Sequence, residues 1–192
     1  MDIIYAKGFE NLKPVFKDLG VVQEGAFTLP DGSVTNKFID TRNAIINPQI
    51  MYDIGYKFQD VFSSKDVSLL VPTSSAGLLF AVGLNTAIHS LQAINSPYTP
   101  EYRILPVRRD DITIWPIVPE KPAVKDSVVY LIESFGSRGT SIWSRKVATA
   151  LRNRGCRIAG MLILVAEAEE MEAFRTKVTP NVVAICQVGE EV

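Results

Sequence analysis

The sequence predicts an α/β domain built on a mainly parallel sheet. The segment 128–132 is a continuous apolar run rich in β-branched residues, a pattern typical of a strand buried on both faces, and the segment 67–71 also predicts a buried strand. Each of these two segments is followed by a short loop of small residues and then by a segment with helical spacing. This alternation predicts three layers around a central sheet of about five or six strands.

The composition of the whole chain indicates a globular protein. The 192 residues are 47% hydrophobic and 21% charged, which suits one domain over residues 1–192. A net charge of −1 gives no electrostatic basis for binding nucleic acid or an anionic membrane. No apolar run is long enough to span a bilayer, and the first residues lack the pattern of a signal peptide. We therefore expect a cytoplasmic protein.

Cysteine and histidine usage argues against a metal centre held by the protein. Cys156 and Cys186 both fall at predicted strands, and we expect free, buried thiols. His89 is the single histidine and lies in an apolar helical stretch, where a structural role is expected. No Cys or His cluster has metal-ligand spacing, so we predict no metal ligands among the site residues.

The N-terminal part predicts a hairpin between two helices. Residues 10–19 form a short amphipathic pattern, and residues 25–42 contain two alternating segments that flank Pro30-Asp31-Gly32, a strong turn signal. The next helix starts at Asn47-Pro48 and runs to about residue 62. We expect residues 1–45 to form a small hood over the carboxyl edge of a core made by 46–192.

The remaining patterns complete the sheet and its covering helices. They predict, in chain order, an apolar helix at 78–91, a strand at 103–109, a second apolar segment at 113–118, a helix at 142–154, a strand at 156–165, an acidic helix at 167–177 and a strand at 181–187.

The stretch 128–141 reads as a strand, a small-residue loop and the start of a helix. Glu133 stands where we expect the strand to leave the sheet. A helix start points its positive end and free N–H groups at one spot, which suits a phosphate group. Gly139 permits a close backbone approach, and nearby hydroxyls add donors. An ordinary turn remains the alternative, because the P-loop lysine and the GxGxxG spacing are absent.

This stretch resembles the ribose-phosphate signature of type I phosphoribosyltransferases, in which two adjacent acids precede a Thr/Gly-rich loop. Glu133 matches the first acid, and Ser134 stands where the second acid belongs. The resemblance implies a three-layer fold with an N-terminal hood. It also implies that the loop holds the 5-phosphate of phosphoribosyl pyrophosphate (PRPP) through Ser137, Arg138, Gly139, Thr140 and Ser141.

The hairpin is similar to that of orotate phosphoribosyltransferases, which carry Phe-x-Leu-x-Ser-Gly and then a strand ending in Asp-x-Arg. The matching residues are Phe27, Leu29, Gly32, Phe38, Asp40 and Arg42. The resemblance implies that Phe27, Asp40 and Arg42 belong to the site. Pro30 and Asp31 replace the family's usual Lys-Ser, and a hairpin kept for packing is the alternative.

Two further segments have counterparts in that family. The loop after the strand at 67–71 corresponds to one that faces pyrophosphate; its members here are Thr73, Ser74, Ser75, Ala76 and Gly77, and a plain turn is the alternative. Arg108-Arg109 partly matches the start of a mobile lid over 108–122, which here is poor in glycine and rich in proline. A solvated pair of arginines is the alternative for these two residues.

The resemblance implies an orotate phosphoribosyltransferase-like protein that transfers a phosphoribosyl group from PRPP to a pyrimidine-type base. Glu133, Ser134, Arg108 and Arg109 are its candidate catalytic residues, and Mg²⁺ is expected only with bound PRPP or pyrophosphate. Ala166-Glu167 replaces the family's Asp-Arg, and a glutamate repels the orotate carboxylate.

An alternative to the enzyme is an inactive module of this fold that binds PRPP or a nucleoside monophosphate for regulation or assembly. Ser134 and the altered lid favour that alternative. In either case the resemblance implies a homodimer, with the segment around Trp115 as a candidate contact.

Overall fold

The computed structural model describes residues 3–28, 34–95, 102–107 and 124–189. Within these ranges a six-stranded sheet has the order β1-β8-β7-β6-β4-β5. All neighbouring strands pair in parallel except β1, which pairs antiparallel with β8. The strands are β1 (Ile3–Tyr5), β4 (Leu69–Pro72), β5 (Arg103–Ile104), β6 (Val128–Gly136), β7 (Arg157–Glu167) and β8 (Val182–Val188). The predicted mainly parallel α/β sheet is confirmed.

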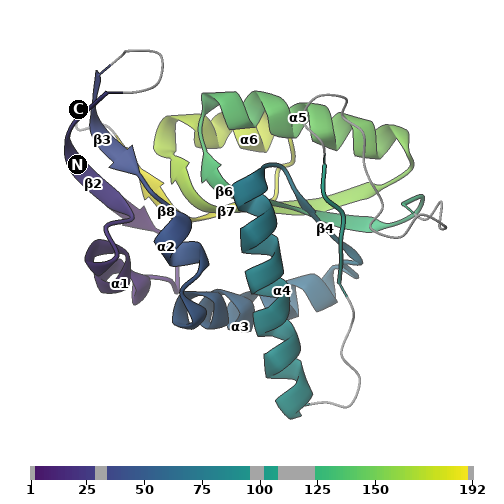
Figure 1. Ribbon diagram of the computed structural model, residues 1–192. Helices are drawn as coiled ribbons and strands as arrows, with labels where there is room; N and C mark the ends of the chain where they lie inside the picture. The colour runs from purple at the N-terminus through teal and green to yellow at the C-terminus, as the bar shows by residue number, and fades with distance from the viewer. Residues whose placement is uncertain (1–2, 29–33, 96–101, 108–123, 190–192) are drawn as a thin grey trace.

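Helices cover both faces of the sheet, as Figure 1 shows. One face carries α3 (Pro48–Ser64) and α4 (Ser75–Asn95), and the other carries α5 (Arg138–Asn153) and α6 (Met171–Lys177). Side chains alternate along β6, so that Ile132 packs into the core beside α3 and α4 while Leu131 packs into the core beside α5. Burial on both faces explains why the strand runs are apolar throughout.

Tyr130 of β6 is buried in the core between the sheet and α3. Its ring lies 4.9 Å from that of Phe62 and 6.1 Å from that of Phe58, between ring centroids. Burial raises the pKa of its phenol to about 12. Gly160 of β7 makes room for this ring, because a Cβ there would lie 2.5 Å from Tyr130 Cε2.

The hood consists of α1 (Leu12–Asp18), the antiparallel strands β2 (Val22–Thr28) and β3 (Val34–Ile39), and the short helix α2 (Arg42–Ile45). The predicted hairpin is confirmed, although its turn at 30–32 lies outside the described residues. Lys37 Nζ donates to the carbonyl of Gly189 at 3.1 Å, which ties the hood to the end of β8. In Figure 1 the hairpin stands on the side where β6, β7 and β8 end.

Several boundaries differ from the expected ones. β6 continues to Gly136, so Glu133 lies inside the strand, opposite Ile163, and not at its exit. α5 begins at Arg138, so most of the expected loop forms the first helical turn. β1 and α2 were not expected, and both are shorter than the windows in which periodicity can be seen.

Other expectations for the core are confirmed. The Asn47 side chain accepts hydrogen bonds from the N–H groups of Gln49 and Ile50 and so caps α3. Both cysteines are free and buried, and burial raises the pKa of the Cys186 thiol to about 12. In the described part of the chain, no helix has the length and apolar character needed to cross a bilayer.

The space around Gly160 yields the first prediction. Gly160→Ala forces a methyl group against the buried Tyr130 ring and should lower the free energy of unfolding by roughly 1–3 kcal/mol. Gly139→Ala is the matched control, because a Cβ there meets no atom of another described part of the chain within 4 Å and should leave stability nearly unchanged. Urea denaturation of both variants measures the difference, and equal midpoints would contradict this packing.

Candidate functional site

Three strand ends meet at the carboxyl edge of the sheet. β4, β6 and β7 are neighbours, with Pro72 opposite Ile132 and Gly136 opposite Ala166. The segment 73–77, the start of α5 and the 3₁₀ helix η1 (Ala168–Glu170) therefore follow adjacent strands. This edge is where open α/β sheets place their ligands.

Glu133 is the most buried charged residue of this edge, with 1% of its surface exposed. Its Oε2 accepts a hydrogen bond from Thr73 Oγ1 at 2.6 Å, and its Oε1 accepts one from Ser74 Oγ at 2.5 Å. These two hydrogen bonds join Glu133 of β6 to the segment that follows β4. The predicted acid and two residues of the predicted pyrophosphate loop are in direct contact.

Glu133 Oε1 accepts from three further donors. They are the Ser134 N–H at 2.8 Å, the Ser134 hydroxyl at 3.3 Å and the Phe135 N–H at 3.4 Å. Among the side chains that the structure describes, no lysine or arginine pairs with this carboxylate. Neutral donors therefore replace the water that the carboxylate loses on burial. We call Thr73, Ser74, Glu133 and Ser134 the Glu133 network.

The first turn of α4 is fixed to this network. The Gly77 N–H donates to Ser74 Oγ at 2.9 Å, while the Ser74 hydroxyl donates to Glu133. A Cβ at Gly77 would lie 2.8 Å from the carbonyl oxygen of Ile132. Glycine at this position is explained by the close approach of α4 to β6.

The start of α5 differs, because part of it is open. Thr140 Oγ1 accepts the Ser137 N–H at 2.6 Å and lies 2.8 Å from the Ser137 carbonyl, so this hydroxyl shapes the turn. Ser141 is buried and donates to Glu170 Oε2 at 2.9 Å. Gly139 is exposed, and among the described residues outside its own helical turn no atom lies within 4 Å of the position its Cβ would take. The Arg138 side chain lies outside the described residues.

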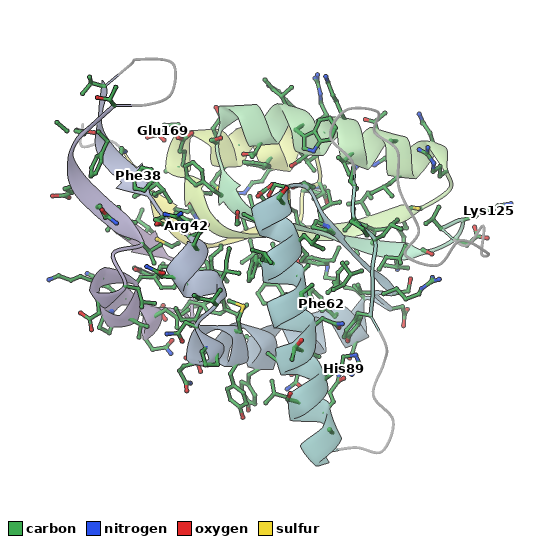
Figure 2. The ribbon with its side chains drawn as sticks, viewed as in Figure 1. Phe38, Arg42, Phe62, His89, Lys125 and Glu169 are labelled. Atoms are coloured by element: carbon green, nitrogen blue, oxygen red, sulfur yellow. The ribbon has the colours of Figure 1, made fainter. Side chains whose placement is uncertain are left out.

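The hood residues lie apart from the Glu133 network. Arg42 donates to both oxygens of Asp40, at 2.8 and 2.6 Å, and its side chain is 77% exposed. These hydrogen bonds lower the pKa of Asp40 and raise that of Arg42. The Phe27 and Phe38 rings pack against each other on the hairpin in a tilted arrangement, with centroids 5.5 Å apart. Figure 2 shows Phe38 and Arg42 on the hood.

Known proteins resemble this chain in structure but not closely in sequence. No family model and no curated protein matches this sequence. Solved structures do match. Orotate phosphoribosyltransferase from Mycobacterium tuberculosis, solved in complex with inorganic phosphate, aligns with a TM-score of 0.64 at 19% identity. The alignment covers 94% of this chain and 95% of that one. The chain has the fold of the type I phosphoribosyltransferases.

Two further structures with this phosphoribosyltransferase fold come from distant organisms. The orotate phosphoribosyltransferase from Aeropyrum pernix gives a TM-score of 0.59 at 22% identity and covers 91% of this chain and 92% of that one. UMP synthase from Leishmania donovani gives 0.61 at 21% identity. That alignment covers 93% of this chain but 35% of the Leishmania protein, so this chain spans about a third of its length.

Some of the site residues predicted from the sequence lie outside the described residues. Arg108, Arg109 and the rest of the 108–122 segment lie outside the described residues, as does Trp115. Where the chain is described, no group of three His, Cys, Asp or Glu residues is arranged to hold a metal ion. Of the predicted site residues, the structure describes Glu133, Ser134, the segment 73–77, the start of α5 and the hood residues Phe27, Asp40 and Arg42.

Two residues that contact the site were missed by the sequence analysis. Ser144 of α5 is fully buried, and its hydroxyl donates to Thr73 Oγ1 at 3.4 Å. Glu170 accepts from Ser141. Ser144 lies one turn after Ser141 on the buried side of the helix, and a polar residue on an apolar helix face was the available signal.

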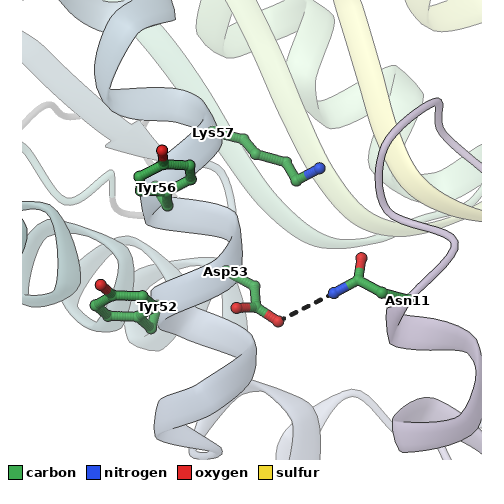
Figure 3. Close-up of a pocket in the computed structure, with 5 residues that line it drawn as sticks. All are labelled: Asn11, Tyr52, Asp53, Tyr56 and Lys57. Carbon is green, nitrogen blue, oxygen red and sulfur yellow. Dashed lines mark hydrogen bonds between the residues drawn. The ribbon is translucent and has the colours of Figure 1, made fainter.

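A separate pocket of about 410 Å³ lies between α1 and α3, away from the carboxyl edge of the sheet (Figure 3). Its lining residues are Asn11, Tyr52, Asp53, Tyr56 and Lys57. Asp53 already accepts from Asn11 at 3.2 Å, and the Lys57 ammonium donates to the Gly8 carbonyl and lies 4.8 Å from the centre of the Phe9 ring. Because this pocket lies away from the ends of β4, β6 and β7, we do not assign it to the candidate site.

The Glu133 network yields the second prediction. Glu133→Ala leaves three hydroxyls and two backbone N–H groups without their acceptor and opens a cavity, so stability should fall by roughly 3 kcal/mol. Asp53→Ala removes a partly exposed carboxylate and should cost about 1 kcal/mol or less. Urea denaturation checks both, and a Glu133→Ala variant as stable as Asp53→Ala would refute the network's structural role.

Proposed function

We propose that the start of α5 binds the 5-phosphate of PRPP or of a nucleoside monophosphate, and that the protein transfers a phosphoribosyl group from PRPP to a pyrimidine-type base. The observation that carries this proposal is the open space at Gly139, in the first turn of a helix at the carboxyl edge of the sheet. In support, the M. tuberculosis enzyme of the same fold has been solved with inorganic phosphate and with PRPP.

The local structure explains why a phosphate suits this position. The first N–H groups of a helix have no partner inside it, and the helix dipole favours an anion there. The Thr140 hydroxyl holds the Ser137 backbone, so the turn has its shape before a ligand arrives. Gly139 leaves room for phosphate oxygens to approach that backbone.

The transfer reaction displaces pyrophosphate from carbon 1 of the ribose through a transition state with oxocarbenium character. We assign the segment 73–77, with Arg108 and Arg109, to the pyrophosphate side. Phe27, Asp40 and Arg42 of the hood are assigned to the base side. Mg²⁺ enters with PRPP as part of the substrate, coordinated by its diphosphate and sugar hydroxyls, because magnesium takes few protein ligands.

A second candidate is a phosphoribosyl-binding module without transferase activity. The observation that favours it is the burial of Glu133, whose carboxylate accepts five hydrogen bonds from within the protein. Ser134 brings no second charge. Glu167, at the end of β7, places a negative charge where an orotate-binding arginine would be needed. For both candidate functions, we propose that the protein is cytoplasmic.

We further propose that the protein is a homodimer, as the resemblance implies. The candidate contact around Trp115 lies outside the described residues, so the proposal rests on the resemblance alone. Light scattering should give twice the mass of one chain, 21.2 kDa. A monomer at micromolar concentration would contradict it.

Calorimetric titration with PRPP and Mg²⁺, and separately with orotidine monophosphate, tests the phosphate site. Gly139→Val fills the open space without touching the core and should weaken binding at least about tenfold. Thr149→Val, at an exposed position further along α5, is the matched control and should bind as the wild type does.

A pyrophosphate-release assay with orotate and with uracil then separates the two candidates. Turnover that needs Mg²⁺ supports the transferase, whereas binding without turnover supports the module. If neither ligand binds to the folded wild type, both candidates are wrong.

A further inference from the structure

Glu133 connects three elements that surround the proposed ligand site. Its own backbone belongs to β6, and its carboxylate accepts from Thr73 and Ser74 ahead of α4. Thr73 in turn accepts from Ser144 of α5. A single buried carboxylate therefore links the segment 73–77 to the helix whose start is proposed to hold the phosphate.

We propose that Glu133 is a positioning residue, which fixes the segment 73–77 against β6 and α5 and does not itself bind the ribose. This role departs from the one expected for an acid at this point of the signature. Its ligand-binding consequences rest on the proposed function, whereas its effect on the segment 73–77 does not.

The Glu133 carboxylate is enclosed by the protein. The residue has 1% of its surface exposed, and its carboxylate accepts four hydrogen bonds at Oε1 and one at Oε2. A sugar hydroxyl reaches this carboxylate only if Glu133 turns away from these donors or the residues that cover it move. If Glu133 turns away, groups such as the buried Thr73 hydroxyl need new partners. Ser134 is also buried, with 3% of its surface exposed.

The Glu133 carboxylate also lies close to the start of α4. The Gly77 N–H donates to the Ser74 hydroxyl, and that hydroxyl donates to Glu133, so the carboxylate is joined to the first turn of α4 by one intervening side chain. A negative charge beside a helix N-terminus is stabilised by the helix dipole. The Glu133 carboxylate is thus an anion of the protein itself that interacts favourably with the N-terminus of α4.

Close packing at Gly77 also restricts the segment 73–77. The absence of a side chain at Gly77 lets α4 lie against the Ile132 carbonyl, with the Glu133 Cα 3.5 Å from the position of a Gly77 Cβ. The segment 73–77 has little room to shift toward β6, and the carboxylate prevents it from moving away. Its geometry at the ligand site is therefore set before binding.

Amide hydrogen exchange in the ligand-free protein tests the positioning role. Glu133→Gln preserves the side-chain volume but leaves one acceptor oxygen where the carboxylate has two. We expect the Gly77 amide to exchange at least about tenfold faster, after correction for global stability, while amides at the centre of β7 do not. Asp53→Asn is the control and should leave Gly77 unchanged. Unchanged exchange at Gly77 in Glu133→Gln would overturn the proposal.

Ligand titrations distinguish a positioning residue from one that touches the sugar. Inorganic phosphate and ribose 5-phosphate are each titrated into the wild type and Glu133→Gln. A positioning residue changes both affinities by the same factor, so their ratio stays within about twofold. A direct contact to the ribose lowers only the ribose 5-phosphate affinity, and a tenfold fall in the ratio would overturn the proposal.

Two controls keep the outcomes separable. If neither ligand binds to the wild type, the proposed phosphate site is wrong, and the exchange of Gly77 alone decides the positioning role. If Glu133→Gln does not fold, Thr73→Val replaces it, because that variant removes one donor to the carboxylate without contacting Gly77. Faster Gly77 exchange in Thr73→Val supports the proposal, and unchanged exchange overturns it.

Discussion

The burial of one carboxylate between β4 and β6 sets the geometry of the carboxyl edge. A charged group without a cation is tolerated inside a protein only when hydrogen-bond donors replace its lost water. Glu133 obtains these donors from its own strand and from the segment after β4. The parallel pairing of Pro72 with Ile132 brings the two segments into register, so the sheet and the carboxylate depend on each other.

The two helices that start at this edge differ in how open their first turns are. Each is linked to a protein carboxylate through a serine hydroxyl, α4 to Glu133 through Ser74 and α5 to Glu170 through Ser141. In α4, Gly77 packs against the Ile132 carbonyl, whereas Gly139 in the first turn of α5 is exposed. The open first turn is the reason why we assign the phosphate to α5.

Much of the fold follows from local sequence patterns. The buried strand runs, the helices that follow them and the Pro-Asp-Gly hairpin were all predicted, because each pattern reports burial or turn chemistry within a few residues. Edge strand β1 was not predictable, since three residues show no periodicity and it is stabilised by pairing with β8.

The site was harder to predict, because its contacts are not local. Glu133 and Thr73 are separated by 60 positions in the chain, and no pattern around Glu133 shows that a strand continues past it. The glycines illustrate the same limit. Gly77 and Gly139 stand in similar loops of the sequence, yet one is required by the packing of α4 on β6 and the other faces open space.

A crystal structure of the complex with ribose 5-phosphate is the most direct test of this account. We expect the phosphate at the first turn of α5, beside Gly139, with the Glu133 carboxylate still bonded to Thr73 and Ser74. A carboxylate that has left these two hydroxyls to bind the ribose would contradict the account, and so would a phosphate bound elsewhere.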